Sequence, residues 1–119
     1  IVNGNKGFIK EIKKRQPSVR VDEEIDPRFL YDFCLVFVRQ SSELEAMVPQ
    51  TIHNLAEDGV LWFAYPRENS GYNNSDLRSD RTWDMINSYG FKAVRLVSID
   101  EDWSALRFRD SRFVRKRKT

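Results

Sequence analysis

The stretch LAEDGVLWFAYPRENSG, residues 55–71, decides the fold. From Val60 to Pro66 nearly every residue is apolar or aromatic, whereas the residues that follow are Arg, Glu, Asn, Ser and Gly. A strand covered on both faces has this composition, which is typical of central parallel strands. Because the polar loop begins where the strand ends, we expect it at the carboxyl edge of a sheet, where α/β folds bind ligands.

A second apolar run, DFCLVFV at residues 32–38, has the same character. We therefore expect residues 33–38 and 60–65 to be neighbouring parallel strands in the interior of a sheet. The segment that joins them has apolar residues at helical spacing, so the sequence predicts a helix there. Ser42 and Glu45 match a capping box, and Gly59 suits the end of the helix. Pro49 predicts a kink or two abutting helical pieces.

The remaining segments continue the alternation of strand and helix. Tyr89 and Gly90 close a helix that we expect to begin at Ser79. The other expected elements are a short strand at Ile1 and Val2, a helix over residues 7–15, a strand over 18–25, a strand over 91–99 and an antiparallel strand over 103–109.

This order predicts one α/β domain, a three-layer Rossmann-like sandwich. Its sheet should be mostly parallel and should end in an antiparallel hairpin, with helices on both faces. We assign residues 1–111 to the domain and residues 112–119 to a basic tail. The first strand is too short to pair well, so we expect it to be incomplete at its start.

Composition and charge exclude several classes of protein. The chain has 119 residues and one cysteine, Cys34, so no internal disulfide can form. We expect a cytoplasmic protein without a membrane span, because no apolar run approaches the roughly 20 residues that cross a bilayer. The tail holds five basic residues, and without them 15 basic residues face 18 acidic ones. A basic tail can contact phosphates, but a solvated terminus is the simpler interpretation, so we do not expect nucleic acid as the main partner.

The layout resembles the class I methyltransferase fold in a shortened form. In that fold a strand like DFCLVFV precedes a helix and a motif of the kind L-x-x-G-G-x-L…P, which LAEDGVLWFAYP matches. The terminal helix and hairpin are also similar. One strand–helix unit between VRVDEEI and DFCLVFV is absent here.

A closer resemblance is to a bacterial family of small domains with no assigned activity. Its members combine an LWVAYPK strand, a Ser/Gly loop leading into Asp-Leu, and a closing D-x-x-W-S-x-L-x-x-R strand. This chain has LWFAYPR, NSGYNNSDL and DEDWSALRFR at those places. The resemblance covers nearly the whole chain and implies a methyltransferase-like domain without implying an activity.

The first candidate site combines the turn Gly4, Asn5 and Gly7 with Asp22. Rossmann-type folds place a glycine-rich turn after the first strand and an acid after the second, so that backbone approaches the ligand and the carboxylate binds ribose. The turn lacks both G-x-G-x-x-G and the acid that methyltransferases carry before it. Close packing in an ordinary strand–helix turn explains the same glycines.

Two further candidates lie near the expected carboxyl edge. The loop after the apolar strand offers Tyr65, Arg67, Asp76 and Arg78, which could clamp a ligand or could cap a helix and face solvent. On the last strand, Trp103 and Arg107 share one face and could form an exposed recognition patch.

The alternative for the last strand is that Trp103 packs in the core while its arginines balance the acidic turn. His53 and Cys34 have no companions at metal-ligand spacing, so we expect no metal site. The sequence contains no G-x-S-x-G turn, and its carboxylates match no recognisable catalytic pair, so no motif indicates catalysis.

The leading interpretation is therefore a non-catalytic binding or interaction module without a cofactor, whose partner is a small molecule or a protein, a homodimer included. The alternative is a diminished methyltransferase-like enzyme or nucleotide binder that holds S-adenosylmethionine at Gly4–Gly7 and Asp22.

Overall fold

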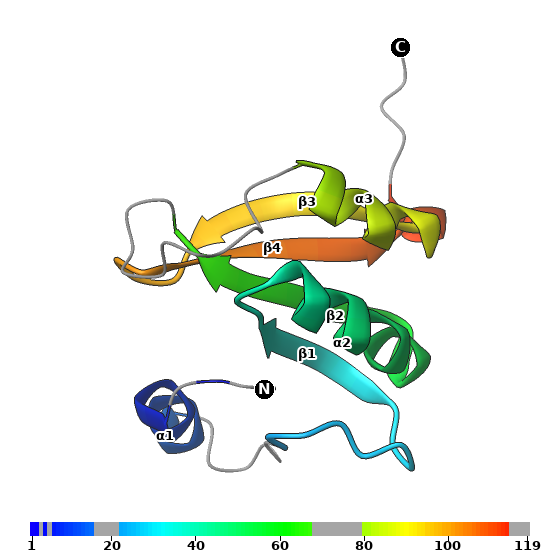
Figure 1. Ribbon diagram of the computed structural model, residues 1–119. Helices are drawn as coiled ribbons and strands as arrows, with labels where there is room; N and C mark the ends of the chain where they lie inside the picture. The colour runs from blue at the N-terminus through cyan, green and yellow to red at the C-terminus, as the bar shows by residue number, and fades with distance from the viewer. Residues whose placement is uncertain (3, 5, 16–21, 68–79, 115–119) are drawn as a thin grey trace.

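A computed structural model of the chain describes residues 1–2, 4, 6–15, 22–67 and 80–114. Its elements alternate between helix and strand as the sequence predicts (Figure 1). They are α1 (Lys6–Arg15), β1 (Tyr31–Phe37), α2 (Ser41–His53), β2 (Leu55–Pro66), α3 (Asp80–Ser88), β3 (Phe91–Ser98), β4 (Trp103–Asp110) and the 3₁₀ turn η1 (Ser111–Phe113). None of the helices in these described residues is both long and apolar enough to cross a membrane.

The two apolar runs form β1 and β2, which pair in parallel as predicted. The register runs from Phe33 opposite Val60 to Phe37 opposite Ala64. On the other side of β1, the backbone of Val2 pairs in parallel, since its nitrogen donates to Leu35 O (2.8 Å) and its oxygen accepts from Phe37 N (2.9 Å). Apart from this isolated bridge, β1 is the edge strand of the four-stranded sheet, whereas β2 lies inside it between β1 and β4. The expectation that both strands lie in the interior is therefore confirmed for β2 and is wrong for β1, whose outer side is covered only at Val2.

The order of the strands is β1-β2-β4-β3. Strand β4 runs antiparallel to both of its neighbours, β2 and β3. It follows that β1, β2 and β3 all point the same way and that β4 alone among these described strands is reversed. The expected mostly parallel sheet with a closing antiparallel hairpin is thus confirmed.

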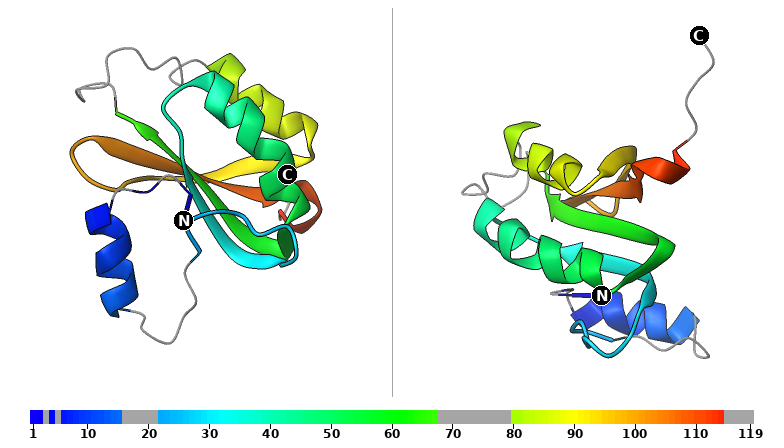
Figure 2. Two further views of the ribbon diagram at one scale, coloured as in Figure 1. Left: turned by 60° about the horizontal axis from the view of Figure 1, so that its bottom comes forward. Right: turned by 90° about the vertical axis from the view of Figure 1, so that its right-hand side faces the viewer.

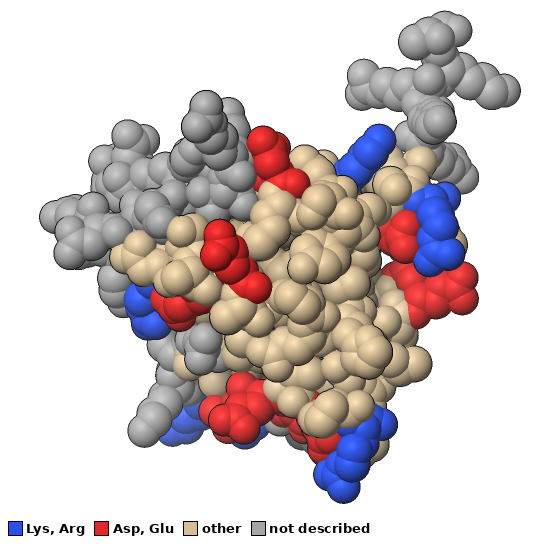
Figure 3. All heavy atoms as spheres, turned by 45° about the vertical axis from the view of Figure 1, so that its right-hand side comes forward, with Lys and Arg blue, Asp and Glu red and all other residues tan. Residues whose placement is uncertain are grey.

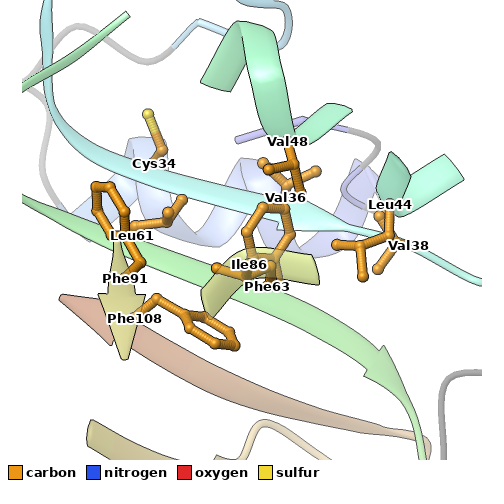
Figure 4. Packing of buried hydrophobic residues seen from close by; sticks show 10 residues of the cluster. All are labelled: Cys34, Val36, Val38, Leu44, Val48, Leu61, Phe63, Ile86, Phe91 and Phe108. Atoms are coloured by element: carbon orange, nitrogen blue, oxygen red, sulfur yellow. The ribbon is translucent and has the colours of Figure 1, made fainter. Parts of the chain in front are cut away.

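The sheet is the middle of three layers. Figure 2 shows α2 and α3 together on one side of it and α1 on the other, near β1 and away from β3 and β4. On the side of α2 and α3, the helix-covered face, ten buried residues form the main core (Figure 4): Cys34, Val36, Val38, Leu44, Val48, Leu61, Phe63, Ile86, Phe91 and Phe108. On the opposite side, the second face, a smaller cluster joins Leu35, Phe37, Ala64, Trp103 and Ala105.

The boundary between α2 and β2 differs from the predicted one. The helix ends at His53 and β2 already begins at Leu55, because residues 56–59 form a bulge rather than the last turn of a helix. Asp58 adopts a left-handed conformation with φ of 53°, which costs an L residue energy. A Cβ on Gly59 would stand 2.8 Å from Leu55 Cδ1 and 3.0 Å from the Ala56 carbonyl oxygen, so glycine is required by close packing inside the bulge.

The start and middle of α2 also correct the prediction. The helix begins at Ser41, its N-cap Gln40 makes no side-chain cap, and Glu43 rather than Glu45 accepts a bond from the Arg39 nitrogen (3.1 Å). The helix runs through Pro49 as one element instead of two pieces. Capping by Ser42 is therefore wrong by two positions, since the N-cap is Gln40.

Other predicted boundaries fall partly outside the described residues. Most of the strand expected over 18–25 and the cap at Ser79 lie there. The described end of that strand, Asp22–Ile25, is not extended sheet. Gly90 follows α3 with φ of 84°, which confirms its predicted role in ending the helix.

We predict that Phe63→Ala lowers the free energy of unfolding by about 3–5 kcal/mol, because Phe63 is fully buried between the sheet and the helices. Phe33→Ala is the matched control, since this phenylalanine of β1 is 51% exposed, and it should change stability by less than about 0.5 kcal/mol. Urea unfolding followed by circular dichroism measures both. Equal losses would contradict the assigned core.

Candidate functional site

An aromatic and cationic stack joins the carboxyl end of β1 to the first residue of β4. The Trp103 and Phe37 rings pack edge to face with their centres 5.1 Å apart. The Arg39 guanidinium lies 5.4 Å from the centre of the Trp103 ring. Trp103 is 6% exposed, so it packs in the second-face cluster while its outer side is covered by a cation. Such contacts contribute about 0.5–2 kcal/mol each and fix the end of β1 to the β3–β4 hairpin.

Arg67 connects the end of β2 to the turn between β3 and β4. Its backbone nitrogen donates to Asp102 O (2.7 Å) and its Nη1 donates to Asp100 O (3.1 Å). The Asp100 carboxylate in turn accepts from the nitrogens of Asp102 (2.8 Å) and Trp103 (2.9 Å). The acidic turn is thus held by its own backbone and by Arg67.

Tyr65 lies one residue before Pro66 and points to the helix-covered face. Its ring centre is 5.2 Å from that of Trp83 in α3. Burial raises the pKa of the Tyr65 hydroxyl, so it stays protonated at neutral pH. Tyr65 and Trp103 therefore lie on opposite faces of the sheet and do not form one patch. Asp76 and Arg78, the other candidates of this loop, fall outside the described residues.

Gly4 follows the short paired segment at Val2, at the carboxyl end of the sheet. A Cβ at Gly4 would stand 2.7 Å from Ile1 Cγ2 and 3.2 Å from Ile9 Cδ1. The chain's own apolar side chains therefore fill this side of Gly4 and would have to move to accept a larger residue. Gly7 belongs to α1, and Asn5 lies outside the described residues.

Asp22 lies on the other side of the Ile1–Val2 segment from Gly4. Its carbonyl oxygen accepts from the Ile1 nitrogen (2.7 Å), and its carboxylate accepts from the hydroxyl of Tyr31 (2.5 Å). Tyr31 is the first residue of β1, and its hydroxyl also accepts from Asp26 N (2.9 Å). Burial and the bond to Asp22 raise the pKa of Tyr31. The Asp22 carboxylate is thus already bonded within the chain, to the first residue of β1.

Arg107 lies in the middle of β4 on the second face, as its predicted alternation with Phe108 requires. Its Nε is buried and has no hydrogen-bond partner in the described part of the chain. The neighbouring Arg109 instead pairs with Asp58 through two bonds of 2.8 and 2.7 Å. The arginines of β4 therefore do not balance the acidic turn; Arg67 contacts it, and Asp58 of the bulge binds Arg109.

The sequence did not single out Phe37, Arg39 or Tyr31. Phe37 lies near the end of the apolar run and Arg39 comes directly after it, which is a signal that they reach the carboxyl edge. Their contact with Trp103 joins residues more than sixty positions apart in the chain, which local patterns do not encode.

The amino edge of the sheet contains a cavity of about 270 Å³ between the bulge and the ends of α3 and β4. Its polar lining includes Glu57, Asp58, Asp110 and Arg112. Asp58 is bonded to Arg109, and Asp110 is bonded to Arg112 (2.9 Å), so these carboxylates are already neutralised. Within the described ranges, no three His, Cys, Asp or Glu residues gather closely enough to hold a metal ion.

The shape of the fold is that of known methyltransferases. The N-methyltransferase NodS from Bradyrhizobium japonicum WM9 superimposes with a TM-score of 0.51 and 18% identity over 92% of this chain and 71% of that one. The structure of NodS in complex with S-adenosyl-L-homocysteine superimposes with a TM-score of 0.53 and 16% identity, over 92% of this chain and 64% of that one. A putative type 11 methyltransferase from Sulfolobus solfataricus superimposes with a TM-score of 0.49 and 14% identity, over 99% of this chain and 74% of that one.

No protein-family profile and no curated protein sequence matches the chain. At such low identities, the likeness to solved structures shows the fold alone. The protein is therefore a small α/β domain with a methyltransferase-like, Rossmann-type fold, in which the closing antiparallel hairpin agrees with the resemblance inferred from its sequence.

We predict that the Cys34 thiol is inert in the folded protein. The side chain is buried, and burial raises its pKa from 9.0 to about 11. Iodoacetamide at pH 8 should label Cys34 in guanidinium but not in buffer, as mass spectrometry would show.

The same shift predicts a dependence of stability on pH. Between pH 9 and 11 the folded thiol keeps a proton that the unfolded thiol loses, so stability is complete below pH 9 and falls as the pH rises toward 11. A Cys34→Ala variant should lose this part of the dependence. The prediction of an inert thiol would be contradicted if iodoacetamide labelled Cys34 rapidly in the native protein.

Proposed function

We propose that this chain is a non-catalytic binding module on a methyltransferase-like scaffold. The position of Asp22 carries the proposal. The acid that would bind a ribose is bonded to Tyr31 at the start of β1. The Gly4 turn instead follows Val2, which pairs with Val36 near the carboxyl end of β1. A carboxylate that is already bonded to a tyrosine hydroxyl is less available to grip the ribose of a nucleoside.

The groups of the carboxyl edge support the same proposal. Trp103 is packed on Phe37 and covered by Arg39, and Arg67 is bonded to the hairpin turn. These side chains hold the strand ends together. A general acid or base needs instead to reach a reacting group with a suitable pKa.

Exposed apolar side chains indicate where such a module meets a partner. Phe29, Leu30 and Phe33 are 40%, 69% and 51% exposed, and they lie close together at the beginning of β1. Apolar groups that gather on a surface in this way commonly mark contact sites. The module would therefore act through a surface that extends from the start of β1.

A second candidate function is a diminished methyltransferase-like cofactor binder. It is favoured by the position of the Gly4 turn, which follows a segment paired in parallel with β1, and by the likeness to a NodS structure solved with S-adenosyl-L-homocysteine. In this case the cofactor would lie over the Gly4 turn at the carboxyl edge. The two candidates differ in what stabilises the protein.

We expect S-adenosyl-L-homocysteine at millimolar concentration to leave the melting temperature unchanged in a thermal-shift assay. A cofactor binder would gain about 2.7 kcal/mol at a ligand concentration of 100 times the dissociation constant. Asp22→Asn, with the exposed Asp32→Asn as its matched control, tests the carboxylate. A saturable shift that only Asp22→Asn weakens would overturn the proposal in favour of the cofactor binder.

A further inference from the structure

The second face of the sheet carries a row of groups across three strands. Trp62 of β2 lies directly opposite Arg107 of β4, which lies directly opposite Arg95 of β3. Two residues further along β4, on the same face, Arg109 lies opposite Lys92. Side chains opposed in this way are about 5 Å apart at their Cβ atoms, and successive rows are about 7 Å apart. We name these four cations the basic rows.

Placing like charges directly opposite each other destabilises a sheet. Asp58 offsets one charge, because it is bonded to Arg109. Lys92 and Arg95 are exposed and form no ion pair in the part of the chain that the structure describes. Because Arg107 Nε also lacks a partner there, the basic rows keep an excess of positive charge. An anionic occupant would remove this repulsion.

Aromatic rings adjoin the basic rows on the same face. Phe33 of β1 lies opposite Val60, on the face that Leu35 and Trp62 share, and is 51% exposed. Trp62 is half-buried beside Arg107. The second face therefore offers two rings on β1 and β2 and four cations on β4 and β3.

The described helices leave this part of the second face uncovered. In Figure 2, α2 and α3 lie on the opposite side, and α1 lies near β1, at a distance from β3 and β4. Figure 3 shows another part of the surface, where Asp and Glu residues lie among Lys and Arg. In the basic rows, by contrast, the ion pair that the described residues form joins Asp58 to Arg109.

The geometry points to single-stranded nucleic acid as the occupant of the second face, with phosphates on Lys92, Arg95 and Arg107 and bases on Phe33 and Trp62. This inference rests on the proposed function, because it names the partner of the binding module. Proteins bind single strands by combining a cationic track with rings on which bases stack. An acidic peptide would use the cations but would have no bases to place on the rings.

The test measures binding of a fluorescein-labelled twelve-nucleotide oligothymidylate by anisotropy at several salt concentrations. The variant Lys92→Glu/Arg95→Glu should weaken binding at least about tenfold. It should also lower the slope of log K against log salt by about 1.4, since each lost phosphate contact accounts for about 0.7. Both residues are exposed, so the variant should fold, and circular dichroism verifies this.

Three further variants separate this surface from the rest of the molecule. Lys14→Glu/Lys10→Glu makes the same change of charge on exposed positions of α1 and should weaken binding less than about threefold. Phe33→Ala should weaken it about fivefold or more with an unchanged salt slope, because stacking carries no charge. Removing residues 115–119, which hold four of the basic residues of the tail, should leave the effect of Lys92→Glu/Arg95→Glu intact.

The inference is overturned if the wild-type chain does not bind the oligonucleotide, or if the two charge-reversed double variants lose equal affinity. It is also overturned if removing the tail abolishes binding, or if a poly-glutamate peptide competes as well as unlabelled oligothymidylate. Failure of the proposed function is seen separately, as stabilisation by S-adenosyl-L-homocysteine. That result concerns the carboxyl edge and leaves the anisotropy measurements unaffected.

Discussion

The parallel pairing of β1 with β2 is the contact on which the rest of the structure depends. Residues 34–38 are all buried, so β1 is covered on both of its faces. Helix α2 crosses between the two strands and places Leu44 and Val48 in the main core. Val2 joins the outer side of β1, and β4 joins the outer side of β2. Each of these additions takes its direction from the central pair, and so the pair also determines where the carboxyl edge lies.

The two faces of the sheet serve different purposes. The helix-covered face holds the larger core and provides most of the hydrophobic stabilisation. The second face contains a smaller cluster near the carboxyl edge, and its remaining part carries cations and rings. A chain of this size can leave part of a sheet face uncovered only if the side chains there are polar enough to be exposed to solvent. Long arginine and lysine side chains meet this requirement because their stems cover apolar surface while their charges stay hydrated.

The sequence was sufficient for features that repeat along one strand or end one helix. Apolar runs predicted β1 and β2, alternation predicted the two faces of β4, and Gly90 marked the end of α3. The bulge at residues 56–59 was not predictable in this way, because Leu55 continues the apolar stripe of α2 and Gly59 resembles a helix end. Only the pairing of Val60 with Phe33 and of Asp58 with Arg109 reveals why the chain turns earlier.

The candidate site was less predictable than the fold. The sequence identified Trp103 and Arg67 as residues of the carboxyl edge, but their partners Arg39 and Asp100 come from distant segments. Asp22 illustrates the same limit, since spacing from Gly4 suggested a shared ligand whereas Tyr31 determines where its carboxylate points. A spacing rule assumes that the acid lies in or at the end of a strand, and the described residues Asp22–Ile25 do not belong to one.

Among the described strands, β4 comes last in the chain, yet it occupies an inner place in the sheet, between β2 and β3. Strand β3 is made earlier, yet its hydrogen-bonded neighbour in this sheet is β4, so it has no strand to join until β4 has been made. During synthesis the nascent polypeptide therefore exposes the apolar margin of β2, a template for unwanted association. A chain that stopped before Trp103 would lose the join between the two halves of the sheet rather than a dispensable margin.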